Sequence, residues 1–355
     1  LLDKERKKQR EKKERKMIKI LNQLFSPIIK LFNKLPTSGQ ILILIILFLS
    51  VVIFFNSLPP CGIGARRSAS IEGYEQRDNF LFMSGPTEIY DDFYANIYDH
   101  LVYNSLKDDY EVGIILNRTS PTTKSVILDV GCGTGHHVAK LAEQGLNVLG
   151  IDISPSMISK AKQNYPEYQF EVGNALNPSQ FMFASFTHIL CLYFTIYYFP
   201  DKTVFFQNCM QWLMPGGYLV VHLVDRDNFD PILPAGNPLY IVSPQRYAKK
   251  RITNTKVKFE DFTYEADFQP NDGSDTYDGT SAPGNGGYSN QVALFNEKVT
   301  LNNGKTRKNQ HTFYMEPEED ILVMAQQVGF IYQAKVDLIK CAYENQYLYI
   351  LTKPE

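Results

Sequence analysis

The sequence predicts an α/β fold in which a mostly parallel seven-stranded sheet has helices on both faces and ends in an antiparallel C-terminal hairpin. Apolar runs alternate with helical patterns between residues 126 and 224, and the first two runs each end in or next to an aspartate. Three glycines at alternate positions follow the first run. Strands that alternate with helices form parallel sheets, which bind ligands at the carboxyl ends of their strands. We therefore expect the ligand site at that edge.

The first strand and its glycines predict a loop that approaches a ligand closely. The strand 126–130 precedes Gly131, Gly133 and Gly135, and a helix follows at 136–144. Glycine has no Cβ atom and adopts positive φ, so backbone N–H groups can approach a bound group, and the helix N-terminus faces the same place. Loops of this kind hold dinucleotides, phosphates or S-adenosylmethionine, so the residues that follow must distinguish these ligands.

The next two strands place polar groups at the same edge. A strand at 147–152 ends in Asp152, which lies 23 residues after Asp129. A carboxylate at this spacing can accept both hydroxyls of a ribose bound at the first loop. A third strand at 168–172 runs into Gly173-Asn-Ala175.

The remaining elements complete the predicted sheet. They are, in order, a strand at 187–193, a helix at 200–213, a strand at 218–224, a helix at 316–328 and an antiparallel pair of strands at 330–338 and 346–352. The turn Met214-Pro-Gly-Gly217 precedes the fifth strand.

Four stretches along this core share the pattern of one family. They are LDVGCGTG at 128–135, GIDISPSM at 150–157, GNA at 173–175 and WLMPGGYL at 212–219. Together they resemble class I S-adenosylmethionine-dependent methyltransferases, most closely the branch that acts on small molecules and on quinone or lipid precursors. The resemblance covers residues 86–225. It implies a Rossmann-like fold, a methyltransferase of the EC 2.1.1 type and S-adenosyl-L-methionine as cofactor.

The resemblance also implies roles for individual residues. Asp129 would order the loop near the methionine amino group, and Asp152 would hold the ribose hydroxyls. The other implied cofactor contacts are Gly131, Cys132, Gly133 and Gly135 in the loop, Ile153 against the adenine ring, Asn174 and Ala175 at the adenine edge, and Leu192. Asn174 departs from the commoner aspartate at its position, although an amide still donates and accepts hydrogen bonds.

Rival chemistries fit the motifs less well. A nicotinamide-dependent dehydrogenase requires G-x-G-x-x-G, whereas His136 stands three residues after Gly133. Methylation of DNA or of glutamine commonly uses an Asn/Asp-Pro-Pro-Tyr/Phe stretch after the fourth strand, where this sequence has Cys191-Leu-Tyr-Phe194. The five cysteines include no CxxC pair, so we expect no metal site and no disulfide framework.

Charge divides the chain into two parts. Residues 1–70 hold 14 Lys and Arg against 4 Asp and Glu, whereas the other 285 of the 355 residues hold 22 against 34. Because the folded part is acidic, a nucleic-acid partner is not expected.

The N-terminal part predicts attachment to a membrane through residues 17–58. Residues 1–40 are basic and amphipathic, residues 41–58 form an uncharged run at the short limit for a transmembrane helix, and residues 59–79 have the composition of a linker. The expected localisation is that of a single-pass membrane protein. The basic residues before the uncharged run favour a cytoplasmic N-terminus, which places the folded domain on the opposite side of the membrane. A cofactor made in the cytosol favours a domain on the cytoplasmic side, so the orientation stays open.

A methyltransferase domain is expected at 80–355, with residues 229–315 inserted as a substrate cover. Such insertions build the acceptor pocket in the family that the sequence resembles. The candidate catalytic residues are Tyr94 and Tyr98, on one helix that begins at Pro86, and His311 and Tyr314 in the insertion. Methyl transfer from a sulfonium depends on positioning, and it needs a base only if the acceptor must lose a proton.

The leading hypothesis for function is a membrane-anchored methyltransferase that acts on a small-molecule or lipid-like acceptor. One alternative is a methyltransferase-fold protein without catalysis that has a scaffolding role at a membrane. A second alternative is a protein methyltransferase, which would present an open acidic groove instead of a closed aromatic pocket.

Overall fold

The structure is a computed structural model that describes residue 36 and residues 80–231, 248–270 and 291–355. The chain divides into two compact units, 1–69 and 70–355, and every described helix and strand belongs to the second. The predicted segments 1–40, 41–58 and 59–79 lie outside the described residues, apart from Pro36. None of the helices in the described ranges has the length and hydrophobicity that crossing a membrane requires.

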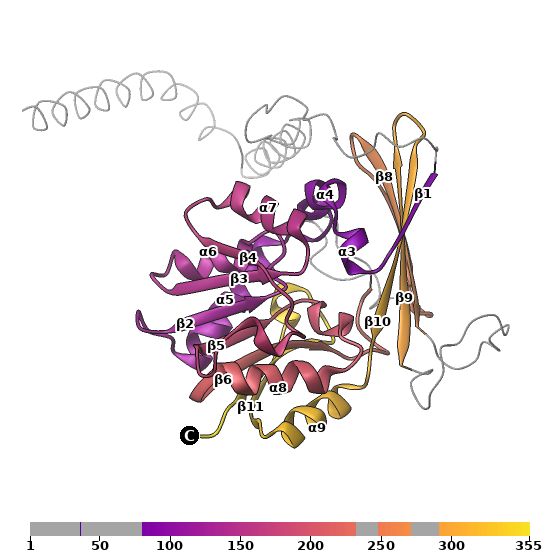
Figure 1. Ribbon diagram of the computed structural model, residues 1–355. Helices are drawn as coiled ribbons and strands as arrows, with labels where there is room; N and C mark the ends of the chain where they lie inside the picture. The colour runs from indigo at the N-terminus through magenta and orange to yellow at the C-terminus, as the bar shows by residue number, and fades with distance from the viewer. Residues whose placement is uncertain (1–35, 37–79, 232–247, 271–290) are drawn as a thin grey trace, which may run out of the picture. The chain divides into compact units, whose positions relative to one another are not determined.

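A seven-stranded sheet has the order β11-β12-β6-β5-β2-β3-β4 (Figure 1). Its strands are β2 (Val126–Val130), β3 (Asn147–Asp152), β4 (Gln169–Val172), β5 (Phe186–Cys191), β6 (Leu213–Val224), β11 (Ile331–Asp337) and β12 (Gln346–Thr352). β2 to β6 pair in parallel, whereas β12 runs antiparallel to both β6 and β11. The predicted α/β fold is confirmed in this coarse form: the sheet is mixed, and a second sheet accompanies it.

Alternate residues of these strands build two cores, one on each face of the sheet. Leu128, Ile189 and Val221 face α8 (Lys202–Trp212) and α9 (Glu318–Val328). Their chain neighbours Ile127, Leu190 and Val220 face α5 (Ser105–Thr119), α6 (His136–Ala142) and α7 (Pro155–Asn164). Burial on both faces explains why these strands are continuous apolar runs in the sequence.

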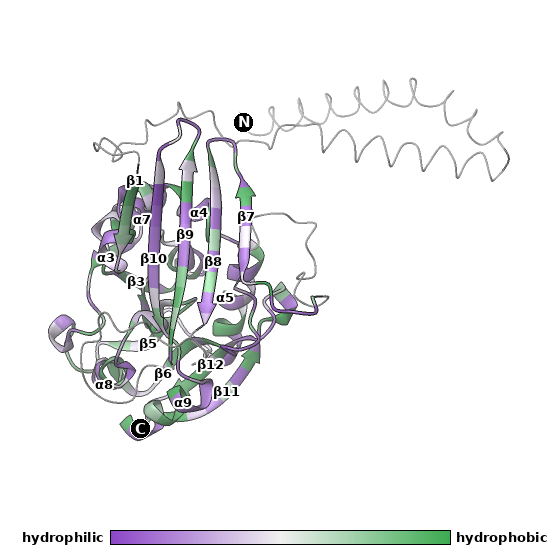
Figure 2. Ribbon diagram, turned by 90° about the vertical axis from the view of Figure 1, so that its right-hand side faces the viewer, coloured by the Kyte–Doolittle hydropathy of each residue, from purple (hydrophilic) through white to green (hydrophobic). Residues whose placement is uncertain are grey.

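A five-stranded sheet has the order β1-β10-β9-β8-β7, and Figure 2 shows its strands side by side. They are β1 (Phe80–Ser84), β7 (Asn254–Lys258), β8 (Phe262–Pro270), β9 (Val292–Leu301) and β10 (Thr306–Tyr314). Neighbours are antiparallel except that β1 runs parallel to β10. The predicted insertion 229–315 thus supplies four strands, and a segment from before the first helix supplies the fifth.

The predicted single helix from Pro86 is wrong, because the chain forms α3 (Pro86–Ile89) and α4 (Asp92–Val102) instead. Asp91 separates them, since its side chain accepts the Tyr94 N–H at 3.0 Å and so caps α4. The buried face of α3 and α4 packs on β8 and β9 of the five-stranded sheet. Figure 1 shows α4 between this sheet and α7.

Candidate active site

The glycine loop is fixed to the end of β3 by its own backbone. The N–H groups of Gly131 and Cys132 both donate to the Ile151 carbonyl, at 2.8 and 2.9 Å. Gly131 and Gly133 have φ of +69° and +55°, and a Cβ atom on Gly131 would lie 2.5 Å from the Thr195 side chain. Only glycine fits this conformation and this spacing without strain. The loop therefore keeps one shape at the carboxyl edge of the sheet.

Asp152 lies where the loop meets the end of β3. Its Oδ2 accepts the Gly133 N–H at 3.1 Å, and its Oδ1 accepts the Ser154 N–H at 2.9 Å. Burial raises the pKa of Asp152 to about 6, against the lowering effect of the N–H groups of Ser154 and Gly133. Each carboxylate oxygen has a further lone pair, so the group can accept two more hydrogen bonds. A ribose diol supplies two donors at this spacing.

Asp129 places a second carboxylate on β2, directly before the loop. Its side chain is buried, and burial raises its pKa to about 7. His137 opposes that rise in the pKa, whereas the carboxylates of Asp152 and Glu111 add to it. A ligand with positive charge beside Asp129 would favour the ionised carboxylate.

A buried ion-pair cluster lies on the helices next to the loop. Glu111 Oε2 lies 2.8 Å from the Lys107 ammonium and 2.9 Å from His137 Nε2. Burial would raise the pKa of Glu111, but Lys107 and His137 outweigh it and lower the pKa to about 2. Burial lowers the pKa of His137, but Asp108 and Glu111 together raise it to about 9. At neutral pH Glu111 and His137 are therefore both charged.

Three of these side chains have the spacing of metal ligands. Ligand atoms of Asp108, Glu111 and His137 lie within 4.8 Å of one another. However, the Lys107 ammonium already occupies the cation position on Glu111, and a histidine with a pKa near 9 has no lone pair to give at neutral pH. The donor set favours an ion-pair cluster over a metal centre.

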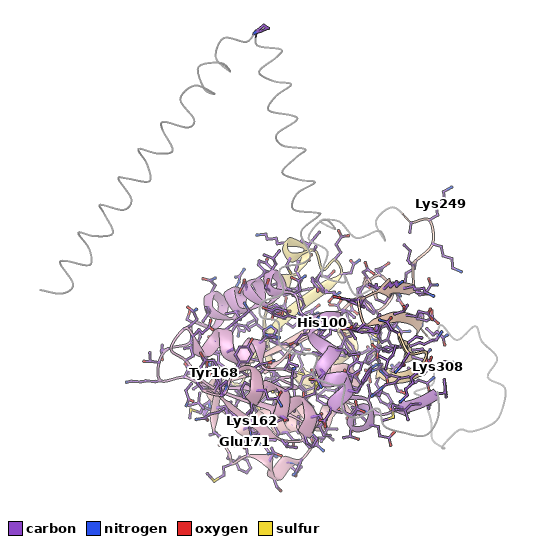
Figure 3. All side chains as sticks on the ribbon, turned by 90° about the horizontal axis from the view of Figure 1, so that it is seen from above. His100, Lys162, Tyr168, Glu171, Lys249 and Lys308 are labelled. Atoms are coloured by element: carbon purple, nitrogen blue, oxygen red, sulfur yellow. The ribbon has the colours of Figure 1, made fainter. Side chains whose placement is uncertain are left out.

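We expect this cluster to make stability depend on pH. The pKa of His137 rises from 6.5 to about 9 on folding, so its contribution is complete below about pH 6.5 and is lost as the pH rises through about 9. The urea midpoint of His137→Gln should therefore lie below that of wild type at about pH 7, and the difference between the two midpoints should shrink as the pH rises to about 9. His100→Gln, on the exposed face of α4 and labelled in Figure 3, is the control. A difference in urea midpoint that stays constant across this pH range would contradict the raised pKa of His137.

The residues expected at the adenine, and Leu192 as a further expected cofactor contact, lie at the ends of β3, β4 and β5. Ile153 is 38% exposed, which suits a side chain that covers a ring, whereas Ala175 and Leu192 are buried. Asn174 Oδ1 accepts the Leu176 N–H at 2.9 Å. The amide oxygen thus closes a local turn, and the amide NH₂ is the group that can reach a ligand. Cys132 is also buried, and its sulfur would lie 2.9 Å from a Cβ atom on Gly150 of β3.

A second polar cluster, formed around Glu297 of β9, was not predicted. The side chain is 2% exposed, and its two oxygens accept four hydrogen bonds. The donors are Tyr94 Oη at 2.8 Å, Tyr264 Oη at 2.6 Å, Asn309 Nδ2 at 3.0 Å and His311 Nε2 at 2.7 Å. Burial would raise the pKa of Glu297, but the His311 ring and these hydrogen bonds hold it below its usual value. Glu297 is therefore ionised at neutral pH.

His311 connects this cluster to residues that follow β5. Its Nδ1 lies 2.6 Å from Tyr198 Oη, and Tyr198 Oη lies 2.9 Å from Tyr90 Oη. The Tyr90 carbonyl accepts the Ser154 hydroxyl at 2.5 Å, so Tyr90 lies beside the Asp152 turn. The structure thus joins the two predicted candidates Tyr94 and His311 through Glu297.

The other two candidates lie in different surroundings. The Tyr98 ring is 6.0 Å from the Tyr90 ring and would be 3.6 Å from a Cβ atom on Gly133, so it borders the loop. The Tyr314 carbonyl accepts a hydrogen bond from the Lys202 ammonium at 2.7 Å. Its side chain belongs to the opposite face of β10 from His311.

Known proteins resemble this chain over the same region. Residues 127–217 match the model of a family described as methyltransferase domain. A structure of an S-adenosylmethionine-dependent methyltransferase from Clostridium acetobutylicum superposes with a TM-score of 0.52 at 16% identity, over 74% of this chain and 98% of that chain. The fold is that of the class I methyltransferases.

Two of the relatives by sequence are named as methyltransferases. The demethylmenaquinone methyltransferase of Chlorobaculum parvum is 30% identical over 148 residues, which is 41% of this chain and 56% of the relative. The ubiquinone biosynthesis O-methyltransferase of Xylella fastidiosa is 29% identical over 127 residues, which is 35% of this chain and 49% of the relative. The chain spans about half the length of these relatives. The comparisons support the predicted enzyme class and cofactor.

Proposed function

We propose that this chain is an S-adenosylmethionine-dependent methyltransferase that acts on a small-molecule acceptor. The observation that carries the proposal is Asp152, whose carboxylate is held at the strand end by the N–H groups of Gly133 and Ser154. Asp152 would hold the ribose hydroxyls, the loop would pass under the methionine part, and Asp129 would face the positive charge. When bound, the cofactor supplies an activated methyl group.

The acceptor would bind between the loop and the five-stranded sheet. Tyr90, Tyr98 and Tyr198 are partly exposed there and have edge-to-face ring contacts at 6.0 Å. Aromatic rings in such a cluster suit a flat or apolar acceptor. The similarity to quinone methyltransferases agrees with this class, and a scaffolding protein or a protein methyltransferase has no comparable support.

We also propose, from the sequence of 41–58 alone, that the chain is attached to a membrane. Retention of the full chain in membranes after an alkaline wash would test this attachment.

Calorimetric titration of the full chain with S-adenosylmethionine tests the cofactor step. Since Asp129 and Asp152 have pKa values of about 7 and about 6 in the protein, a cationic ligand must displace their protons at low pH. We expect affinity to rise between about pH 5 and about pH 7.5, with proton release near pH 6 visible as a dependence of the heat on the buffer. Asp129→Asn should reduce this release. Binding with no proton release would contradict the assigned carboxylates, and no binding at any pH would contradict the function.

A further inference from the structure

The hydrogen bonds around His311 have one consistent direction. An ionised carboxylate can only accept, so the proton of the imidazole lies on Nε2, which donates to Glu297 at 2.7 Å. In the neutral imidazole, Nδ1 then carries the lone pair and accepts the Tyr198 hydroxyl at 2.6 Å. The Tyr198 oxygen in turn accepts the Tyr90 hydroxyl at 2.9 Å. Each group therefore donates inward, from Tyr90 through Tyr198 and His311 to Glu297, and the Tyr90 oxygen can accept a hydrogen bond from outside the network.

The outer end of this chain lies at the proposed cofactor site. Tyr90 is bonded through its carbonyl to Ser154, whose N–H binds Asp152. Its ring contacts Tyr98, which borders Gly133. The inner end is buried, since Glu297 and His311 are each 2% exposed. The network thus connects the space beside the loop to a buried base and its counter-ion.

We propose that His311, reached through Tyr198 and Tyr90, accepts the proton of a hydroxyl group on the acceptor. The proposal rests on the methyltransferase function above and specifies its substrate class, an aromatic hydroxyl compound. A neutral amine attacks with its own lone pair and needs no base before transfer, whereas a hydroxyl becomes a strong nucleophile only as it loses its proton. A buried histidine paired with a carboxylate is arranged for that task.

The step balances in atoms and electrons. With the cofactor bound, the acceptor oxygen would form a bond to the methyl carbon with a lone pair, and the bond from that carbon to sulfur would break and leave its electron pair on sulfur. The acceptor proton passes to the Tyr90 oxygen as the Tyr90 proton passes to Tyr198 and the Tyr198 proton to Nδ1 of His311. Glu297 holds the imidazolium, which later releases its proton to solvent.

A purely structural role explains the cluster less well. The other residues on this face of β9 are Ala293, Phe295, Val299 and Leu301, so an apolar side chain at position 297 would continue the packing. Burying a carboxylate with four polar partners generally gives no more stability than an apolar replacement. The groups that titrate or carry charge around His311 are Glu297, Tyr198, Tyr90 and Tyr94. Glu297 is the one that stabilises its protonated form.

The test uses the full chain saturated with S-adenosylhomocysteine and the probe 4-nitrophenol, whose absorbance reports its ionisation. We expect the bound probe in the wild type to be ionised more than in solution, because its proton moves to His311. His311→Gln keeps a hydrogen-bonding side chain but no base, and should lower the ratio of ionised to neutral bound probe by about tenfold, which is one pKa unit. Tyr198→Phe removes one oxygen of the relay and should have the same effect. It is the variant to use if His311→Gln does not fold.

The controls separate the possible failures. His100→Gln replaces an exposed histidine of α4 and should behave as wild type. A probe that binds the wild type with the same ionisation as the variants, or that does not bind the saturated protein at about 10 mM, overturns the relay and its substrate class. Failure to bind S-adenosylhomocysteine overturns the proposed function instead.

Discussion

Asp152→Ala is expected to lower the affinity for S-adenosylmethionine by about 100-fold or more, because two charge-assisted hydrogen bonds to the ribose are lost. The same change removes the acceptor for the N–H groups of Gly133 and Ser154, which also loosens the loop. Calorimetric titration of the full-length variant measures the loss.

Two further variants serve as comparisons for Asp152→Ala. Asp152→Asn keeps one oxygen that can accept an N–H group, so its affinity for S-adenosylmethionine should lie between those of Asp152→Ala and wild type. Glu171→Ala removes an exposed acid from the neighbouring β4, labelled in Figure 3, and should leave affinity unchanged. Equal affinity of Asp152→Ala and wild type would place the cofactor elsewhere.

Arg307→Met is expected to destabilise the folded protein by about 2–3 kcal/mol. Arg307 is 1% exposed, and its Nη1 contacts both oxygens of Asp91 at 2.8 Å. Its Nη2 donates to the Ile89 carbonyl at 2.7 Å, and its Nε donates to Asn309 at 2.8 Å. These contacts hold the ends of α3 and α4 on the five-stranded sheet. Asp91 is partly exposed, so water limits the loss to less than that of a fully buried pair.

Thermal unfolding measures this effect, and we expect Tm to fall by about 5 °C or more. Lys308→Met is the matched control, because Lys308 is the next residue on β10 and is exposed on the opposite face (Figure 3). Equal Tm values for the two variants would show that the Arg307 contacts do not hold these helices.

The central strands of the α/β sheet, β2, β5 and β6, were predictable because they are buried on both faces. The runs that contain Ile127, Leu190 and Val220 are apolar throughout, so they stand out in the sequence without any knowledge of tertiary contacts. Asp152 follows from the same pattern, since it ends such a run at a fixed distance from the glycine loop. Local sequence therefore carries most of the information about this half of the site.

The five-stranded sheet was only partly predictable. β1 and β10 were missed, because the buried face of β10 has Arg307, Asn309 and His311, which give no apolar alternation. Arg307 contacts Asp91, which is 216 residues away in the chain, and Asn309 and His311 contact Glu297 on the neighbouring strand β9. Glu297 lies between Phe295 and Val299 on the same face of β9. A charged residue in this apolar face was the one indication in the sequence of a polar cluster there.

The most direct test of the account is a crystal structure of the full chain with S-adenosylhomocysteine. We expect both ribose hydroxyls within about 3 Å of the Asp152 carboxylate and the adenine against Ile153. The Tyr90 hydroxyl should face the space next to the sulfur, in line with the position of the transferred methyl group. A ribose bound away from Asp152, or a Tyr90 hydroxyl that faces away from the sulfur, would contradict the central claim that this edge of the sheet is a methyl-transfer site.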